Sequence, residues 1–417
     1  TTGWGGASYT GPRSAAPFAI LDAIYSGIQL VLSANPSAQF VPMDSFWSVN
    51  NTLIDPSTET FDITAGNFTA SFYRSDIDSL FLLGDASIDT EEFDDHVILH
   101  EWGHYFEDTF SRSDSIGGPH AIGESIDARL AFGEGWATAF AAMALDDPIY
   151  CDSGVVGAIS GFGLNAENDS FGVNGWFNEF DVTTLIYDLY DTDADGTDTN
   201  SIGFGPIYDT MVGPQSVTPA WTTVHSFATE LRSMLAPSFQ TFLDSQLNDE
   251  NIVNGPGLDI WGSSETNNAN SGRDVLPVYT DITADGSVTN VCTNSDFDSD
   301  RDGNKLAEYR LLRVTIPVTD TYDVAAITTT NTPVTPDPSD RDQSDPDMQL
   351  YRNGVSVLPF GVGLSPVENS ETFTTPTLIA GATYVADIHE WRFEDFEGAP
   401  PNYPDRICFD ISFTQTP

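Results

Sequence analysis

Two histidines, His100 and His104, enclose a glutamate in the segment His-Glu-Trp-Gly-His at residues 100–104. Residues four apart lie on the same face of an α-helix, so both imidazoles can reach one metal ion. Glu101 lies one step round the helix, where its carboxylate can take a proton from water and pass it to a leaving group. The spacing therefore predicts a metal-dependent hydrolase, and a buried helix that binds no metal is the alternative.

A third ligand is expected from a later helix, and Glu134 is the best candidate. It lies between Gly133 and Gly135 and precedes a run of alanines. Glycine inside a helix costs about 1 kcal/mol relative to alanine, so these glycines indicate a place where two backbones approach closely. That packing would bring Glu134 to the metal. Glu124 is the other candidate, but it lacks a neighbouring face of small residues.

These segments resemble the gluzincin zinc metallopeptidases, the clan that contains the thermolysin-like enzymes, and in particular secreted bacterial proteins. The resemblance is carried by residues 96–120 and 131–142, and it extends in detail over about residues 80–145. It implies zinc as the cofactor, with three ligands and a general base: His100, His104, Glu134 and Glu101.

Two features separate this chain from other zinc peptidases. The interval between His104 and Glu134 is longer than the one that thermolysin-like enzymes use. The extended metzincin pattern requires glycine and histidine at positions where this chain has Glu107 and Phe110. The metzincin class is therefore disfavoured.

The resemblance also implies how a peptide substrate would bind and react. Residues 79–85 would form an edge strand to which the peptide adds, and an ordinary core strand is the alternative. The developing oxyanion needs a donor. In thermolysin-like enzymes this donor follows the helix after the third ligand, where this chain has Tyr187 and Tyr190 but no histidine. Tyr190 and His225 are the candidates, whereas His120 is expected to be a loop residue.

These assignments predict a secreted zinc endopeptidase that acts on peptide or protein substrates with Glu101 as the general base. The lack of an obvious oxyanion histidine near residue 190 keeps a second interpretation open. In that interpretation the chain is a catalytically weak or inactive surface binding or assembly protein on the same fold.

The pattern of apolar residues changes near residue 285. Before it, helical spacing recurs at 15–33, 92–110 and 125–145, with further helices expected at 180–190, 203–212 and 218–247,. After it, short β-branched runs alternate with turn residues. We therefore predict an α+β fold class, with a zincin-type domain over 1–285 and an all-β sandwich over 286–417. The second domain resembles the pre-peptidase C-terminal sandwich, which implies a surface polymer or substrate as its partner, or removal during maturation.

Two acidic segments carry the Asp-x-Asp-x-Asp-Gly core that calcium loops use. Neither completes an EF-hand, because Ile202 occupies the bidentate position in the first and Glu308 falls one place short in the second. Calcium loops and solvated acidic turns both remain open. The candidate ligands are Asp191, Asp193 and Asp195 in the first segment, and Asp296, Asp298, Asp300 and Asp302 in the second.

The chain is strongly acidic, with 63 acidic and 14 basic residues, a single lysine (Lys305) and a net charge of -49. It cannot assemble a basic surface for phosphate groups, so nucleic acid and an anionic membrane surface are poor partners. Self-repulsion of this size is tolerated where salt screens it or divalent cations bind. A halophilic or marine, calcium-rich exterior is therefore expected.

Three further features concern processing, membrane insertion and the cysteines. The chain starts at Thr1 without a charged-then-apolar leader, as expected of a processed, secreted protein,. The most apolar segment, residues 16–32, is interrupted by polar residues and predicts a buried amphipathic helix without membrane insertion,. Cys292 and Cys408 bracket the C-terminal region and are predicted to form a disulfide, which leaves Cys151 unpaired,. Three unlinked thiols are the alternative.

Overall fold

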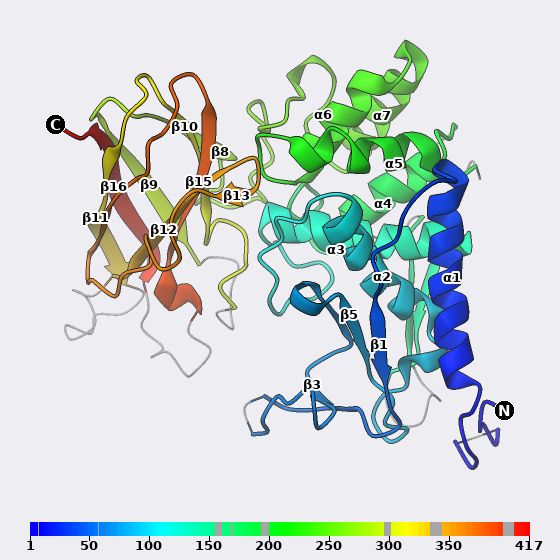
Figure 1. The fold of residues 1–417 in the computed structure, drawn as a ribbon. Helices are drawn as coiled ribbons and strands as arrows, with labels where there is room; N and C mark the ends of the chain where they lie inside the picture. Colours follow the sequence, from blue (N-terminus) through cyan, green and yellow to red (C-terminus); the bar gives the residue numbers. More distant parts are fainter. Residues whose placement is uncertain are drawn as a thin grey trace.

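The computed structural model describes residues 1–6, 8–56, 58–154, 161–167, 170–192, 200–295, 302–333, 344–394 and 404–417. They form a mixed α+β N-terminal region followed by a β-rich C-terminal region (Figure 1). The predicted fold class is confirmed. The division into domains 1–285 and 286–417 stays a prediction, and the first strand of the C-terminal sheets begins at Tyr279.

Helices build most of the N-terminal region and enclose one large apolar core. The helix predicted over 218–247 is wrong as a single element. Leu235 and Ala236 adopt extended backbone angles before Pro237, because the residue before a proline disfavours the helical conformation,. The helices are α1 (Ala16–Ala34), α2 (Asp95–Phe110), α3 (Ala128–Leu145), α4 (Glu179–Tyr190), α5 (Phe204–Val212), α6 (Val224–Met234) and α7 (Pro237–Asp249).

A small sheet with the strand order β1, β5, β4 packs against α2. β5 (Ser79–Leu82) pairs in parallel with β1 (Asp44–Trp47) and antiparallel with β4 (Phe72–Arg74). The prediction of an edge strand at 79–85 is therefore wrong, since β5 is the buried central strand and β4 is an edge. Two further strand pairs are formed by β2 (Thr52–Leu53) with β3 (Asn67–Phe68), and by β6 (Ile149–Asp152) with β7 (Phe162–Asn165).

Small residues let α2, α3 and α4 pack closely. A Cβ placed on Gly103 would lie only 2.8 Å from the Cα of Ala137, so α2 meets α3 at this glycine. The indole of Trp136 donates a hydrogen bond to the Gly103 carbonyl at 3.1 Å. A Cβ on Gly135 would lie 2.5 Å from the carbonyl oxygen of Glu179. Gly135 thus marks the predicted close backbone contact, but against α4 instead of α2.

One face of α1 packs on this core and the other remains exposed. At Gly27 a Cβ would lie 3.0 Å from the ring of Trp102. Phe18 and Leu21 are 73% and 60% exposed, so the predicted burial is confirmed for one face only. Among the described residues, α1 alone is long and apolar enough to cross a membrane, and core helices meet the same criterion.

Two sheets form the C-terminal region and pack face to face over a second apolar core,. Their strand orders are β13, β12, β15, β10, β8 and β14, β11, β16, β9. Cys292 and Cys408 are cross-strand partners and form the predicted disulfide, while Cys151 is free. The strands are β8 (Tyr279–Thr283), β9 (Val288–Asn294), β10 (Arg310–Thr315), β11 (Tyr322–Pro333), β12 (Pro346–Arg352), β13 (Val355–Ser356), β14 (Ser370–Thr374), β15 (Thr383–Glu390) and β16 (Pro404–Gln415).

A buried ion pair joins the two regions. The guanidinium of Arg129 on α3 donates to Asp387 on β15 at 2.7 Å and to Asp127 at 2.9 Å. Beside it, Ile126 and Lys305 form an isolated antiparallel bridge. The segment that leads into β10 therefore lies against the start of α3.

Candidate metal centre and active site

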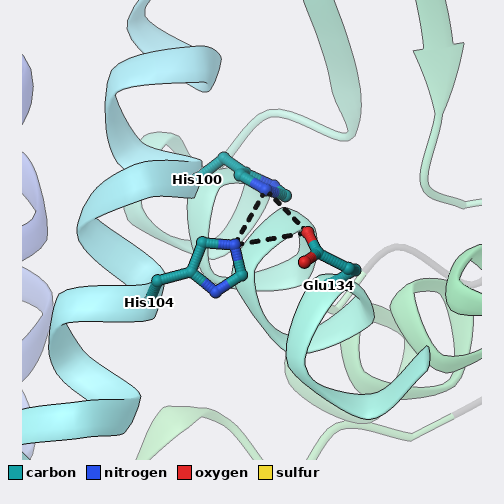
Figure 2. A group of neighbouring side chains, drawn as sticks. All are labelled: His100, His104 and Glu134. Carbon is teal, nitrogen blue, oxygen red and sulfur yellow. Dashed lines mark hydrogen bonds and ion pairs between the residues drawn. The ribbon is translucent and has the colours of Figure 1, made fainter. Parts of the chain in front are cut away.

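Three side chains from α2 and α3 converge on one point (Figure 2). The Nε2 atoms of His100 and His104 are 3.2 Å apart, and each lies 3.2 Å from Oε2 of Glu134. All three residues are partly buried. The structure therefore brings the three predicted zinc ligands together.

This set of donor atoms fits zinc. Imidazole nitrogens and a carboxylate oxygen bind zinc at about 2.0–2.2 Å, which at tetrahedral angles places the ligand atoms about 3.3–3.6 Å from one another. The observed separations of 3.2 Å are close to that spacing. Three protein ligands are typical of catalytic zinc sites, whereas structural sites usually have four.

Thr138 on α3 orients one of the histidines. Its Oγ1 lies 3.0 Å from Nδ1 of His100. When Nε2 of His100 binds a metal ion, Nδ1 carries the ring hydrogen and donates it to the Thr138 hydroxyl. Partners of this kind fix the tautomer and the ring orientation of a metal-binding histidine. Thr138 follows Glu134 by four residues, so the same face of α3 carries both, a signal that could have been read from the sequence.

Glu101 lies between the histidines and β4. The side chain is nearly buried, and its Oε2 accepts a hydrogen bond from the backbone N–H of Tyr73 at 2.7 Å. Burial raises the pKa of Glu101, although His100 and His104 oppose the rise. A carboxyl group with a raised pKa is suited to accept a proton and to return it.

The ligand carboxylate is held in its ionised form. Burial by itself would raise the pKa of Glu134, but His104, His100 and His120 bring it well below the ordinary value. Burial would likewise lower the pKa of His104, but the carboxylates Glu134 and Glu101 raise it to about 9. Glu134 can therefore serve as an anionic ligand across the neutral range.

His120 and Glu179 form a further part of the polar wall, and the sequence interpretation missed both. Nε2 of His120 lies 3.2 Å from the carboxylate of Glu179 and 3.6 Å from that of Glu134. Its Nδ1 lies 3.0 Å from the carbonyl oxygen of Gly118. Both ring nitrogens face oxygen acceptors, so the imidazolium form is favoured. Burial lowers the pKa of His120, but Glu134 and Glu179 outweigh this effect and raise it.

An open cleft of ≈ 910 Å³ contains the three ligands, Glu101 and His120. Residues 69–75, which include β4, form one part of its lining, and residues 113–120 form another. A second pocket of ≈ 290 Å³ shares His100 and His120 with the cleft. Its remaining lining is largely apolar and includes Ile122, Tyr150, Phe162, Leu164 and Phe180.

Tyr190 and His225 are not part of this cleft. His225 is fully buried and pairs with Glu265 at 3.1 Å. Tyr190 lies at the end of α4, where its hydroxyl is 3.5 Å from Asp146. The predicted oxyanion role is corrected for both residues, since neither side chain lines the space around the ligands.

Glu124, the alternative third ligand, also lies outside the cluster. Its side chain is 40% exposed and forms an ion pair with Lys305 at 3.2 Å. The small-residue face of α3 therefore distinguished the two candidates correctly, because it is Glu134 that meets His100 and His104.

Most of the predicted calcium ligands cannot be placed. Asp193, Asp195, Asp296, Asp298 and Asp300 lie outside the described residues. Of the two that are described, Asp191 is nearly buried at the end of α4, and Asp302 accepts a hydrogen bond from Lys305 at 2.9 Å. Calcium binding by these two segments stays a prediction.

Between residues 42 and 235 the chain has the fold and the site of a gluzincin-type zinc metallopeptidase domain. Residues 42–235 match the family model described as the Mycolysin C-terminal domain. The matched segment runs from just before β1 to the end of α6 and includes every residue of the cleft described above. A comparison with curated proteins found no match. The C-terminal sheets lie outside the matched segment, so their resemblance to pre-peptidase sandwiches stays a prediction.

Proposed function

We propose that this protein is a secreted, zinc-dependent endopeptidase. The observation that carries the proposal is the meeting of His100, His104 and Glu134 at 3.2 Å, with Glu101 beside them in an open cleft. The disulfide and the net charge of -49 support an extracellular location, because disulfides persist in oxidising compartments,.

The three ligands would hold the metal, and the other polar residues would move protons. Zinc, when bound, supplies a Lewis acid that polarises the scissile carbonyl and makes water more acidic. Glu101 accepts the proton of the attacking water and returns it to the leaving amine. The hydrogen bond from the Tyr73 N–H holds the carboxylate of Glu101 in place.

His120 takes the place of Tyr190 and His225 as the proposed oxyanion donor. It lies beside the ligand carboxylate of Glu134, and it is favoured in its charged form by Glu179. A charged N–H donor near the developing oxyanion stabilises the transition state more than the ground state. Glu179 keeps the ring oriented toward the cleft.

The shape of the cleft supports an extended peptide as the substrate. β4 is an edge strand along the cleft, so a peptide can pair with its backbone,. The adjoining apolar pocket fits one apolar side chain of that peptide next to His100,. We therefore propose unfolded polypeptides with an apolar residue near the cleaved bond as substrates. The β-rich C-terminal region would act as an accessory domain.

Cleavage of an unfolded protein by the purified chain tests this function. Glu101→Gln and a chelator should each abolish activity, and Glu101→Gln should retain zinc. Glu368→Gln is the matched control, because Glu368 is exposed in the C-terminal region and does not line the cleft. If the wild-type chain retains zinc and leaves a broad peptide library intact, the peptidase proposal is wrong and a binding or assembly role replaces it.

A further inference from the structure

A second group of metal-capable side chains lies apart from the zinc ligands. Asp89, Glu91 and Asp152 each place one carboxylate oxygen within 4.8 Å of the others. Asp89 precedes the 3₁₀ turn Glu91–Phe93, which leads into α2. Asp152 ends β6, which follows α3. The group therefore connects the segment before one ligand-bearing helix to the segment after the other.

Glu91 has a buried oxygen atom without a partner. The residue is 3% exposed, and none of the described residues forms a hydrogen bond with its Oε2. Leaving a charged oxygen unpaired in a buried place is costly, so such an atom indicates a ligand that satisfies it. Within the described part of the chain, the hydrogen bonds to the other two members are local, from the Thr90 N–H to Asp89 and from the Gly154 N–H to Asp152.

No cationic side chain neutralises the group within the described part of the chain. The ion pairs found there include none to Asp89, Glu91 or Asp152. Arg13 is directed to the neighbouring Glu92 instead. Burial and the nearby carboxylates raise the pKa of Asp89 to about 6 and that of Glu91 well above its ordinary value. The carboxylates repel one another unless a cation or protons join them.

We infer that Asp89, Glu91 and Asp152 form a binding site for a divalent cation of the calcium class. Calcium binds oxygen atoms at about 2.3–2.6 Å, so two oxygens on one ion can be up to about 5 Å apart, which accommodates the observed spread. The group contains no nitrogen or sulfur donor, which separates it from the zinc site. This site differs from the two acidic segments at 191–198 and 296–303.

The cation would act on the peptidase site through the backbone. It ties the turn before α2 to the end of β6, and these elements already contact each other near Asp94, which accepts a hydrogen bond from the Ser153 hydroxyl at 2.6 Å. A cation that binds the folded chain and not the unfolded chain raises the free energy of unfolding. At saturating concentrations this increase grows with the logarithm of the cation concentration. Cation binding at this site does not depend on catalysis. Calcium binding can therefore be found in a chain that has no peptidase activity, and peptidase activity can be found in a chain that binds no calcium here.

Counting bound calcium tests the inference. The zinc-loaded full chain is titrated with calcium chloride by calorimetry in high monovalent salt, which suppresses diffuse binding to the acidic surface. Glu91→Gln and Asp152→Asn should each bind one equivalent fewer than the wild type, and Glu368→Gln should match the wild type. Equal stoichiometry in the wild type and both site variants, or no calcium bound by the wild type, would overturn the site.

Thermal unfolding gives a second measurement, in which the effect of Glu91→Gln on the melting temperature should depend on calcium. In calcium-free buffer with equimolar zinc, Glu91→Gln should melt at or above the wild type, because it removes a buried repelling charge. In calcium, it should melt below the wild type. A variant that melts lower by the same amount in both buffers would show a packing defect and contradict the inference. Tyr150 lies on β6 two residues before Asp152, close enough to Glu91 and Asp152 for their charges to help raise its pKa. If neither site variant folds, terbium luminescence sensitised by Tyr150 decides: emission should fall in Tyr150→Phe and be lost when calcium displaces terbium. Unchanged emission would reject the site.

Discussion

The two sides of the cleft are built by different means. His100, His104 and Glu134 belong to two helices that touch at Gly103 and Ala137, so helical spacing and one close contact set their positions. The opposite side carries His120 in the irregular segment between α2 and α3.

Partners from distant parts of the sequence hold that irregular segment in place. The side-chain amide of Asn304 donates to the carbonyls of Gly117 and Pro119 at 3.0 Å. The only lysine, Lys305, donates to the Pro119 carbonyl at 2.9 Å. Binding of the metal is therefore encoded locally, whereas placement of His120 depends on residues between β9 and β10 of the C-terminal region.

Removing a helix-borne ligand should have the largest effect. Glu134→Gln replaces an anionic donor, so we expect zinc affinity to fall by well over the roughly 10–100-fold typical of residues that only support a ligand. Activity should fall with it. Zinc content after dialysis and the rate of peptide cleavage measure the two effects. Glu124→Gln is the control, and a similar loss of zinc in that variant would show that the third ligand is misassigned.

Removing the donor on the opposite side should leave the metal in place. His120→Ala is expected to lower kcat by about 10²–10³-fold, as for loss of one oxyanion donor. Zinc content should not change. Tyr190→Phe should behave like the wild type, because its hydroxyl contacts Asp146 outside the cleft. A near-wild-type kcat for His120→Ala would show that another residue is the oxyanion donor.

Thr138 tests how far the ligand helices depend on supporting contacts. Thr138→Val removes the hydroxyl that accepts the Nδ1–H of His100, and we expect a roughly 10–100-fold loss of zinc affinity or activity,. Thr138→Ser keeps the hydroxyl and should retain most of the affinity. Competition with a zinc-binding dye gives the comparison. Equal losses in the serine and valine variants would mean that packing matters here and the hydrogen bond does not.

Lys305 tests the long-range support of the irregular segment. Lys305→Gln should displace Pro119 and therefore His120, and small displacements of catalytic groups are costly, so we expect kcat to fall about tenfold. KM and zinc content should change little, and Lys305→Arg should recover part of the rate. If KM rises while kcat is unchanged, the segment binds substrate and does not position the oxyanion donor.

This contrast explains which parts of the site could be predicted from the sequence. The spacing of His100 and His104 and the glycines around Glu134 are local patterns, and the helices that they predict are present. Helix boundaries were predictable where the periodicity was strong, but the prediction of one continuous helix across Pro237 was wrong. His120 has no periodic neighbours, and its partner Glu179 is 59 residues away in the sequence. Only the packing of α4 on α3 brings them together, and no local signal encodes that contact.

The smallest expected effect concerns selectivity in the apolar pocket. Leu164 lies on β7 and is nearly buried in the pocket that adjoins His100. Leu164→Ala enlarges this space. A difference of one methylene in an apolar pocket changes discrimination between substrates by roughly 10–200-fold. Because this pocket is partly open, we expect an effect at the lower end of that range. The variant should therefore shift preference from leucine toward phenylalanine near the cleaved bond, about tenfold in relative kcat/KM. Peptide pairs that differ at one residue measure the ratio. An unchanged ratio would show that the substrate side chain occupies another part of the cleft, while the roles of the ligands and His120 would stand, because those rest on different contacts.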